Sequence, residues 1–473
     1  MGAAPSFGRE DLAPFAIDPV RRGSPAAARH SRFPGSEPAP PNAEPPVRRR
    51  VWERGRGDGV LRKMRVLFIS QYFPPEMGAP AARTYELARR WVQLGAQVTV
   101  VTAVPNHPTG IVPARYRGKL VYEENTDGIR VLRTWIYAAA NRGFWRRSLN
   151  YFSFMLSSLW LGVRRAGPVD VIVATSPQFL VGLSGWVASC LYRVPLVFEV
   201  RDLWPDSIAA LGVLREGLVL RSLRRLEMML YRHATRIVGV AQSTQDELVR
   251  RGVDPEKIVI IPNGADSEVF RDLEKYNGIR ENLSLGRKFV VSYIGTHGLA
   301  HGLETVLDSA ERLRDQEDIA FLFVGDGAER EGLMRRAEEL ALPNVHFLGV
   351  QPRERIPYYL ATSDVSLVPL RRKPLFEKVL PSKLFEIMGC SRPVILGVEG
   401  EAREAVERAG AGLCVRPEDP QQLTEAILTL YRDPDLAGAL GRNGRTFVRR
   451  HYCRDRLATT YFDVLDAVVA ESR

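Results

Sequence analysis

The chain has 473 residues, 45% of them hydrophobic, which predicts two or three domains with sizeable cores. Its net charge is +11, and residues 1–63 hold +5 of this, because 12 Lys and Arg stand there against 7 Asp and Glu. No apolar run reaches the ~20 residues of a transmembrane helix, and we expect no signal peptide.

The basic charge admits two large partners, nucleic acid and an anionic membrane surface. The sequence shows no basic zipper, zinc-finger spacing or aromatic RNA-binding motif, which weakens the nucleic-acid interpretation. The cysteines stand far apart and form no C-x-x-C pair, and we expect three of them to be core thiols in a reducing cytosol: Cys190, Cys390, Cys414 and Cys453.

Residues 1–63 form the first predicted segment, a basic tail rich in Pro and Arg. Ten of the 32 prolines lie there among repeated Arg, Ala and Gly, a composition typical of disorder. The first predicted strand follows Met64 directly. We expect the tail to be dispensable, or an over-extended gene start, and a functional basic arm is the alternative.

From Met64 onward, short apolar runs alternate with helical stretches, as in parallel sheets that helices cover on both faces. The first predicted strands are 66–70, 97–102, 169–175, 194–200 and 236–240, with helices at 79–94 and 148–165 among the intervening stretches. A second series is 289–294, 320–324, 345–348, 365–368 and 394–398. The pattern predicts two doubly wound, Rossmann-like α/β domains, 64–272 and 287–455, which a polar linker separates. A last helix, 456–473, is expected to cross back to the first domain.

Ligands of such domains bind at the carboxyl ends of the strands, which directs attention to two loops of the first domain. The first strand runs into a rigid loop that ends in Gly78, where backbone can approach a ligand closely; the alternative is an ordinary βα loop. The fourth strand ends in FEVRDLWPD. There Asp202 is the candidate polar group facing the cleft and Arg201 the candidate phosphate or acid binder, unless the two form a pair that closes the loop.

The second predicted domain opens with a strand and a loop that contains Gly295, His297, Gly298 and His301. Such a loop can cradle a diphosphate through its backbone amides, and Gly325 ends the next strand in the same way. The two histidines also suggest a metal site, but no third ligand with suitable spacing follows. We therefore predict no metal.

The window LPSKLFEIMGCSRPVI, residues 380–395, carries most of the functional signal. Ser382 is a predicted N-cap, so free amides and the positive dipole end would meet a phosphate at Ser382 and Lys383. Glu386 lies one turn further on the same face, where its carboxylate can accept two hydroxyl hydrogens from a diol. The alternative is an amphipathic helix with a solvated Lys and Glu.

A basic aromatic stretch, residues 141–167, is the candidate membrane contact. It contains arginines and interleaved aromatic residues and no acid up to Arg165, which is typical of an interfacial helix on anionic lipid. We expect its C-terminal half to pack in the core and its N-terminal end, with Arg142, Arg146 and Arg147, to touch lipid.

Together these segments resemble the family 4 retaining glycosyltransferases, nearest to the fucosamine-transferase-like branch that builds bacterial O-antigen and capsule. The resemblance covers about residues 64–470, and five segments carry it: FISQYFPPEMGAPAAR, FEVRDLWPDSIAALG, IPNGAD, GLAHGLET and LPSKLFEIMGC. It implies the GT-B fold, two Rossmann-like domains facing across a cleft, with the donor in the C-terminal domain and the acceptor in the N-terminal one.

The resemblance also implies site residues. Glu386 matches the second, ribose-binding Glu of the family's E-x7-E motif, whereas Lys378 stands where the first Glu is expected. Thr296 and His301 replace the family's usual Arg and Lys in the first loop of the domain. Lys378 and Lys383 are expected to supply that charge, and the amides of Gly295–Gly298 and Gly78 to assist at the leaving diphosphate.

The implied activity is metal-independent transfer of a sugar, an N-acetylated hexosamine or deoxyhexosamine, from a UDP-linked donor to a lipid-linked or polysaccharide acceptor. The nucleotide sugar is a substrate, and no cofactor is expected. The enzyme would sit peripherally on the inner face of the cell membrane without binding nucleic acid. The alternatives are a nucleotide-sugar epimerase of the same fold and a basic nucleic-acid-binding protein.

Overall fold

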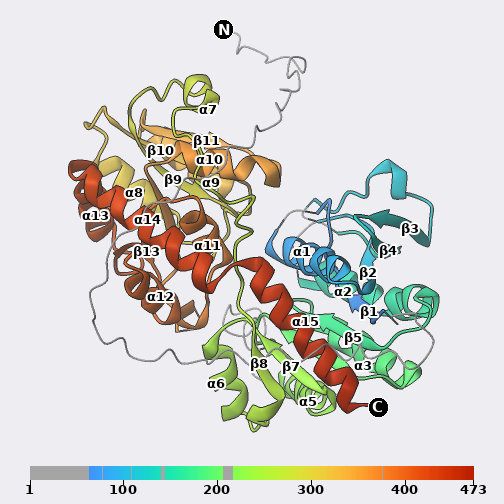
Figure 1. The fold of residues 1–473 in the computed structure, drawn as a ribbon. Helices are drawn as coiled ribbons and strands as arrows, with labels where there is room; N and C mark the ends of the chain where they lie inside the picture. Colours follow the sequence, from blue (N-terminus) through green and yellow to red (C-terminus); the bar gives the residue numbers. More distant parts are fainter. Residues whose placement is uncertain (1–62, 77, 108, 140–143, 206–216, 375) are drawn as a thin grey trace, which may run out of the picture. The chain divides into compact units, whose positions relative to one another are not determined.

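A computed structural model describes residues 63–473 except 77, 108, 140–143, 206–216 and 375 (Figure 1). The predicted tail, apart from Lys63, therefore lies outside the described residues, as does Arg142. The described chain forms two sheets, one of eight strands and one of six. Apart from the β3–β4 hairpin of the first sheet, both are built from short apolar strands, as the alternating sequence pattern predicts.

The first sheet has the strand order β3-β4-β2-β1-β5-β6-β7-β8 and is parallel except for the β3–β4 pair. Its strands are β1 (Arg65–Ile69), β2 (Gln97–Ala103), β3 (Val121–Thr126), β4 (Ile129–Thr134), β5 (Val171–Thr175), β6 (Leu196–Val200), β7 (Arg236–Gly239) and β8 (Ile258–Ile260). The sequence analysis missed β3 and β4. The β3–β4 hairpin turns at Asp127-Gly128, both with positive φ, the dipeptide typical of such turns.

The second sheet is wholly parallel, in the order β11-β10-β9-β12-β13-β14. Its strands are β9 (Phe289–Ile294), β10 (Ile319–Val324), β11 (Val345–Leu348), β12 (Val365–Pro369), β13 (Val394–Gly397) and β14 (Gly412–Cys414). The first five were predicted within a residue. The sequence analysis missed the three-residue β14, which pairs with β13 at the sheet edge.

Helices fill the connections, and the predicted helix at 79–94 is α1 (Ala79–Gln93). The predicted helix at 148–165 begins earlier, as α2 (Phe144–Ser157), and continues as one π turn and one 3-10 turn to Arg165. The remaining α-helices of the described residues are α3 (Leu180–Tyr192), α5 (Leu218–His233), α6 (Gln242–Arg250), α7 (Gly278–Asn282), α8 (Glu304–Arg312), α9 (Arg330–Glu339), α10 (Ile356–Thr362), α11 (Ser382–Gly389), α12 (Glu401–Ala409), α13 (Pro420–Arg432), α14 (Pro434–His451) and α15 (Arg454–Glu471).

Helix α15 packs on the first sheet although the segment before it belongs to the second. Tyr461, Leu465 and Val468 recur at helical spacing and are buried in one core with strands β1, β5 and β6. Trp91 of α1 donates its indole N–H to the carbonyl oxygen of Ala458 at 3.1 Å, and Figure 1 shows α15 running beside α1. The last helix thus completes the cover of the first sheet.

Each sheet has one inner strand whose two neighbours in the sheet both come later in the chain. In the first sheet β1 lies between β2 and β5, and in the second β9 lies between β10 and β12. Ligands of doubly wound sheets bind where the strand order reverses in this way. The loops after β1 and β9, which contain Gly78 and Gly295, are therefore the first places to look for a site.

The cysteines correct one prediction. Cys390 is buried, Cys414 and Cys453 are half-buried, and Cys190 is exposed, so only one is a core thiol. Burial raises the pKa of Cys390 to about 12.

Among the described helices, none combines the length and the apolar character needed to span a bilayer.

Candidate functional site

Two glycine loops lie against each other at the carboxyl end of the second sheet. Gly295 follows β9 with a φ of 144°, and Gly325 follows β10 with a φ of 138°, values that L side chains rarely adopt. A Cβ on Gly325 would come within 2.0 Å of the Gly295 carbonyl oxygen. Glycine is therefore needed at Gly325 for the two loops to approach.

The hydrogen bonds of the backbone amides in the loop after β9 correct part of a second prediction. The Gly295 amide donates to the carbonyl oxygen of Val324 at 2.9 Å, and the His297 amide donates to that of Asp326 at the same distance. These two donors hold the loops together, so two of the four amides that the sequence analysis expected at a diphosphate are already used within the protein.

Lys383 supplies a positive charge at this place. Its ammonium donates to the Tyr293 hydroxyl at 3.0 Å, and that hydroxyl donates to the Thr296 carbonyl oxygen at 2.6 Å. A Cβ added to Gly295 would lie 2.7 Å from the Lys383 Nζ atom, so the glycine makes room for the cation. Burial lowers the pKa of Lys383 to about 7, and the Glu386 carboxylate opposes this shift.

Helix α11 presents Lys383 and Glu386 on one face, three residues apart. The Glu386 side chain is 16% exposed, and its Oε1 atom accepts from the Arg353 guanidinium at 3.1 Å. The predicted cap is wrong: α11 begins at Ser382, Pro381 holds the N-cap position, and no side chain caps the helix. Proline at that position leaves Ser382 inside the first turn, where its backbone amide faces the helix N-terminus.

The two histidines of the loop after β9 have a structural role in that loop. His297 is fully buried among the rings of Tyr293, Phe323 and Phe347. Burial, and then the charges of Arg330 and Lys383, lower its pKa to about 4. Burial and the Lys383 charge lower the pKa of His301 to about 3, so both rings are neutral at pH 7. No group of three His, Cys, Asp or Glu in the described part of the chain could hold a metal ion.

Gly298 lies beside the His301 ring, whereas Lys378 lies at another place in the structure. A Cβ on Gly298 would lie 3.8 Å from the His301 ring. The Lys378 ammonium donates instead to the Glu247 carboxylate of α6 at 3.0 Å, in a separate hollow of about 610 Å³ that Leu203 and Arg224 also line. The expectation that Lys378 shares the charge beside Lys383 is therefore corrected, and Lys383 remains.

In the first sheet the structure brings Gly78 and Arg201 together. Gly78 has a φ of 131° and takes the N-cap position of α1. The Arg201 guanidinium donates to the carbonyl oxygen of Ala79 at 3.4 Å, and its amide donates to the Ser176 hydroxyl at 2.8 Å. Asp202 is exposed. Arg201 thus bonds to the first turn of α1, and the Asp202 side chain stays accessible to a ligand.

Close to these residues, a buried ion pair joins the carboxyl end of β6 to the N-terminal part of α1. The Arg83 guanidinium lies 3.0 Å from the Glu199 carboxylate, and neither side chain is more than 6% exposed. Burial alone would raise the pKa of Glu199, but Arg83 and Arg201 hold it below its ordinary value. Arg83 also donates to the carbonyl oxygens of Ile261 and Pro262 after β8.

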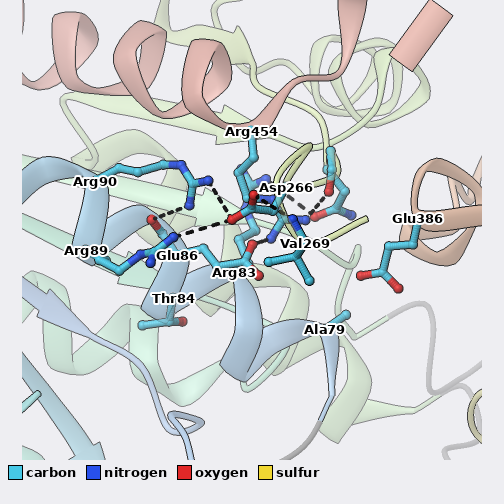
Figure 2. A network of polar contacts seen from close by, with 12 residues as sticks. Ala79, Arg83, Thr84, Glu86, Arg89, Arg90, Asp266, Val269, Glu386 and Arg454 are labelled. Carbon is cyan, nitrogen blue, oxygen red and sulfur yellow. Dashed lines mark hydrogen bonds and ion pairs between the residues drawn. The ribbon is translucent and has the colours of Figure 1, made fainter. Parts of the chain in front are cut away.

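Sequence reasoning missed the residues that link the two sheets. Arg353, which follows β11, donates to Glu86 of α1 at 2.8 Å as well as to Glu386. Glu86 also pairs with Arg454 at the start of α15, and Figure 2 shows both within one polar network. A charged loop directly after a strand was the one available signal, but the partners lie far away in the sequence.

Comparison with known families divides the chain as the two sheets do. The description "Glycosyl transferase 4-like domain" matches residues 78–264, and "Glycosyl transferases group 1" matches residues 277–447. The first range includes α1 and the Arg201 loop. The second includes the glycine loops and α11.

Individual proteins resemble most of the chain. The probable glycosyltransferase WbjE of Pseudomonas aeruginosa is 30% identical over 66% of this chain and 78% of its own length. The putative colanic acid biosynthesis glycosyl transferase WcaI of Escherichia coli is 25% identical over 77% of this chain and 91% of its own. The structure of HepE from Anabaena in complex with UDP and glucose superposes with a TM-score of 0.64 at 21% identity, over 85% and 99% of the two chains. The structural likeness confirms the predicted GT-B fold.

Proposed function

Because the chain belongs to the family 4 glycosyltransferases, we propose that it moves a sugar from a nucleotide donor to a lipid-linked or polysaccharide acceptor, with retention of the anomeric configuration. The observation that carries this proposal is helix α11. It holds a cation, Lys383, against the loop after β9, and an acceptor carboxylate, Glu386, one turn further on. A cation binds a diphosphate, and a carboxylate accepts the hydroxyl hydrogens of a ribose diol.

The donor would bind with its diphosphate at Lys383 and its ribose hydroxyls on Glu386. The complexes of HepE with UDP and with UDP-glucose support a UDP-linked donor. The resemblance to the fucosamine-transferase branch supports an N-acetylated hexosamine or deoxyhexosamine as the transferred sugar. The name of WcaI, a putative colanic acid biosynthesis glycosyl transferase, supports a place in cell-surface glycan assembly.

In the reaction, the bond between the sugar C1 and the diphosphate oxygen breaks, and the acceptor hydroxyl attacks C1 from the same face. Negative charge grows on the leaving diphosphate, and a fixed cation stabilises that charge more than it stabilises the intact donor. Lys383 is the catalytic residue for this step. The departing phosphate takes the acceptor proton, so no side-chain nucleophile is needed.

The first sheet would receive the acceptor. Arg201 is placed beside the Gly78 turn, where its guanidinium can bind an anionic group of the acceptor. Asp202, the next residue, is exposed and can accept a hydrogen bond from an acceptor hydroxyl. These roles follow from the positions of the two residues at the carboxyl end of β6.

An apolar face of α2 supports a lipid-linked acceptor. Large side chains are 41–78% exposed along the helix and its continuation, at spacings of three and four residues that place them on one side: Trp145, Leu149, Phe152, Leu156 and Trp160. Arg146, Arg164 and Arg165 are exposed nearby, and residues 144–165 contain no acid. The buried and the exposed side chains thus lie on different faces of the helix. The sequence analysis expected instead a C-terminal half packed in the core and an N-terminal end in contact with lipid.

We take the partner of this face to be an anionic bilayer, because aromatic and aliphatic side chains flanked by Arg match its interface. Replacing Phe152 and Trp160 by Ser should weaken co-sedimentation with phosphatidylglycerol vesicles at least tenfold, since each loses buried apolar area. Leu218→Ser is the matched control, because Leu218 is 75% exposed on α5. Unchanged vesicle binding of the double variant would remove α2 from the membrane contact.

The donor proposal is tested with UDP, GDP and ADP sugars and the Glu386→Ala variant. We expect a raised donor KM for Glu386→Ala with the fold intact, because the ribose diol loses its acceptor. Glu404→Ala, at an exposed Glu on α12, is the control and should keep parent kinetics. Unchanged kinetics of Glu386→Ala would contradict the site, and conversion of the donor sugar without any acceptor would favour the epimerase alternative.

A further inference from the structure

Arg353 joins three segments that are distant in the sequence. One guanidinium nitrogen lies 2.8 Å from the Oε1 atom of Glu86 on α1 and 3.1 Å from the Oε1 atom of Glu386 on α11. The guanidinium carbon lies 5.3 Å from the ring centre of Phe270, in the connection between β8 and α7. A long side chain held at three points in this way loses most of its freedom, so its position is well defined.

The charges around Arg353 show why it reaches Glu386. Glu86 is only 7% exposed and already pairs with Arg454, so its single negative charge lies between two cations. Figure 2 shows this pair in one polar network, with Glu386 pointing toward it from α11. The positive charge of Arg353 that Glu86 does not neutralise is therefore available to the Glu386 carboxylate.

A carboxylate that binds a ribose diol must be ionised and correctly oriented before the nucleotide arrives. The contact with Arg353 at 3.1 Å fixes one oxygen of the Glu386 carboxylate. An ionised carboxylate has about four acceptor positions, so the guanidinium and two hydroxyl groups can be bound together. Fixing the side chain in advance removes an ordering cost that the nucleotide would otherwise meet.

We propose that Arg353 is a positioning residue for ribose recognition. Its guanidinium is anchored to Glu86 of α1 and orients the Glu386 carboxylate. This inference rests on the proposed binding of a nucleotide donor at α11. It adds a residue that does not touch the donor but decides how well Glu386 distinguishes a ribose from a deoxyribose.

The test compares ribonucleotides with their deoxy analogues. Dissociation constants of UDP, GDP and their 2′-deoxy forms are measured by calorimetry for the full chain and for Arg353→Ala, Arg353→Lys and Arg355→Ala. The last is the control, because Arg355 is exposed in the same 3-10 turn. A hydroxyl bound to a charged acceptor should favour the ribonucleotide by about tenfold or more in the parent.

We expect Arg353→Ala to reduce this preference at least threefold while the deoxy form binds almost as before, and Arg353→Lys to restore part of it. In a Glu386→Ala background, Arg353→Ala should change nothing further, since it acts only through Glu386. If Arg353→Ala weakens binding of the ribonucleotide and of its deoxy form equally, Arg353 contacts the nucleotide directly. An unchanged preference would show a simple tie between the sheets, and tighter UDP binding would show that Arg353 competes with ribose; each result overturns the inference. Failure of the parent to bind either ribonucleotide contradicts the proposed donor itself.

Discussion

Lys383 should make donor binding depend on pH above neutrality. Its pKa in the free protein is about 7, chiefly because burial disfavours the charged ammonium. A bound diphosphate restores the charge and raises that pKa, so binding is strongest below the free pKa and weakens as pH rises toward the bound pKa. At pH 7 about half of the molecules carry the cation, and at pH 8.5 about 3% do, so UDP affinity should fall about 15-fold over this range.

Calorimetric titration with UDP at pH 7.0, 7.5, 8.0 and 8.5 measures this fall directly, in a range above the titration of the UDP terminal phosphate. Lys383→Met is the matched variant, since it keeps most of the side-chain volume and has no charge to lose. Its affinity should be low and nearly constant over the four pH values. A parent affinity that does not change with pH, or an equal slope in Lys383→Met, would refute the role of Lys383 as the phosphate cation.

Two further predictions concern the support of the site. Glu199→Gln leaves the buried Arg83 charge unpaired, which should cost roughly 3–5 kcal/mol of unfolding free energy; a melting temperature equal to the parent's would show that the pair is not needed. Gly325→Ala places a Cβ 2.0 Å from the Gly295 carbonyl oxygen at a φ of 138°, so UDP binding should be lost, whereas Gly332→Ala on α9, where nothing lies within 4 Å, should bind UDP like the parent.

The features that sequence reasoning predicted are local ones. Five strands of the second sheet, β9 to β13, are apolar runs bounded by glycine or polar residues, and their pattern alone located them. Lys383 and Glu386 lie on one short helix, so their common face follows from helical spacing. Gly295 and Gly325 were identified because each directly follows a buried strand.

The features that it missed depend on contacts between distant segments. Arg83 and Glu199 are separated by 116 residues, and Glu86 and Arg353 by 267, so no spacing rule connects them. The Gly295 and His297 amides were expected to face a phosphate, but the neighbouring loop uses them. The hairpin β3–β4 was missed because its strands are polar as well as apolar, although Asp127-Gly128 marks its turn.

The most direct test of the account is the structure of the protein crystallised with UDP. We predict a diphosphate oxygen within hydrogen-bond distance of the Lys383 ammonium and the ribose hydroxyls on the Glu386 carboxylate, with Arg353 still bonded to that carboxylate. UDP bound elsewhere, for example in the hollow beside Lys378 and Glu247, with Lys383 and Glu386 free of ligand, would contradict the proposed donor site.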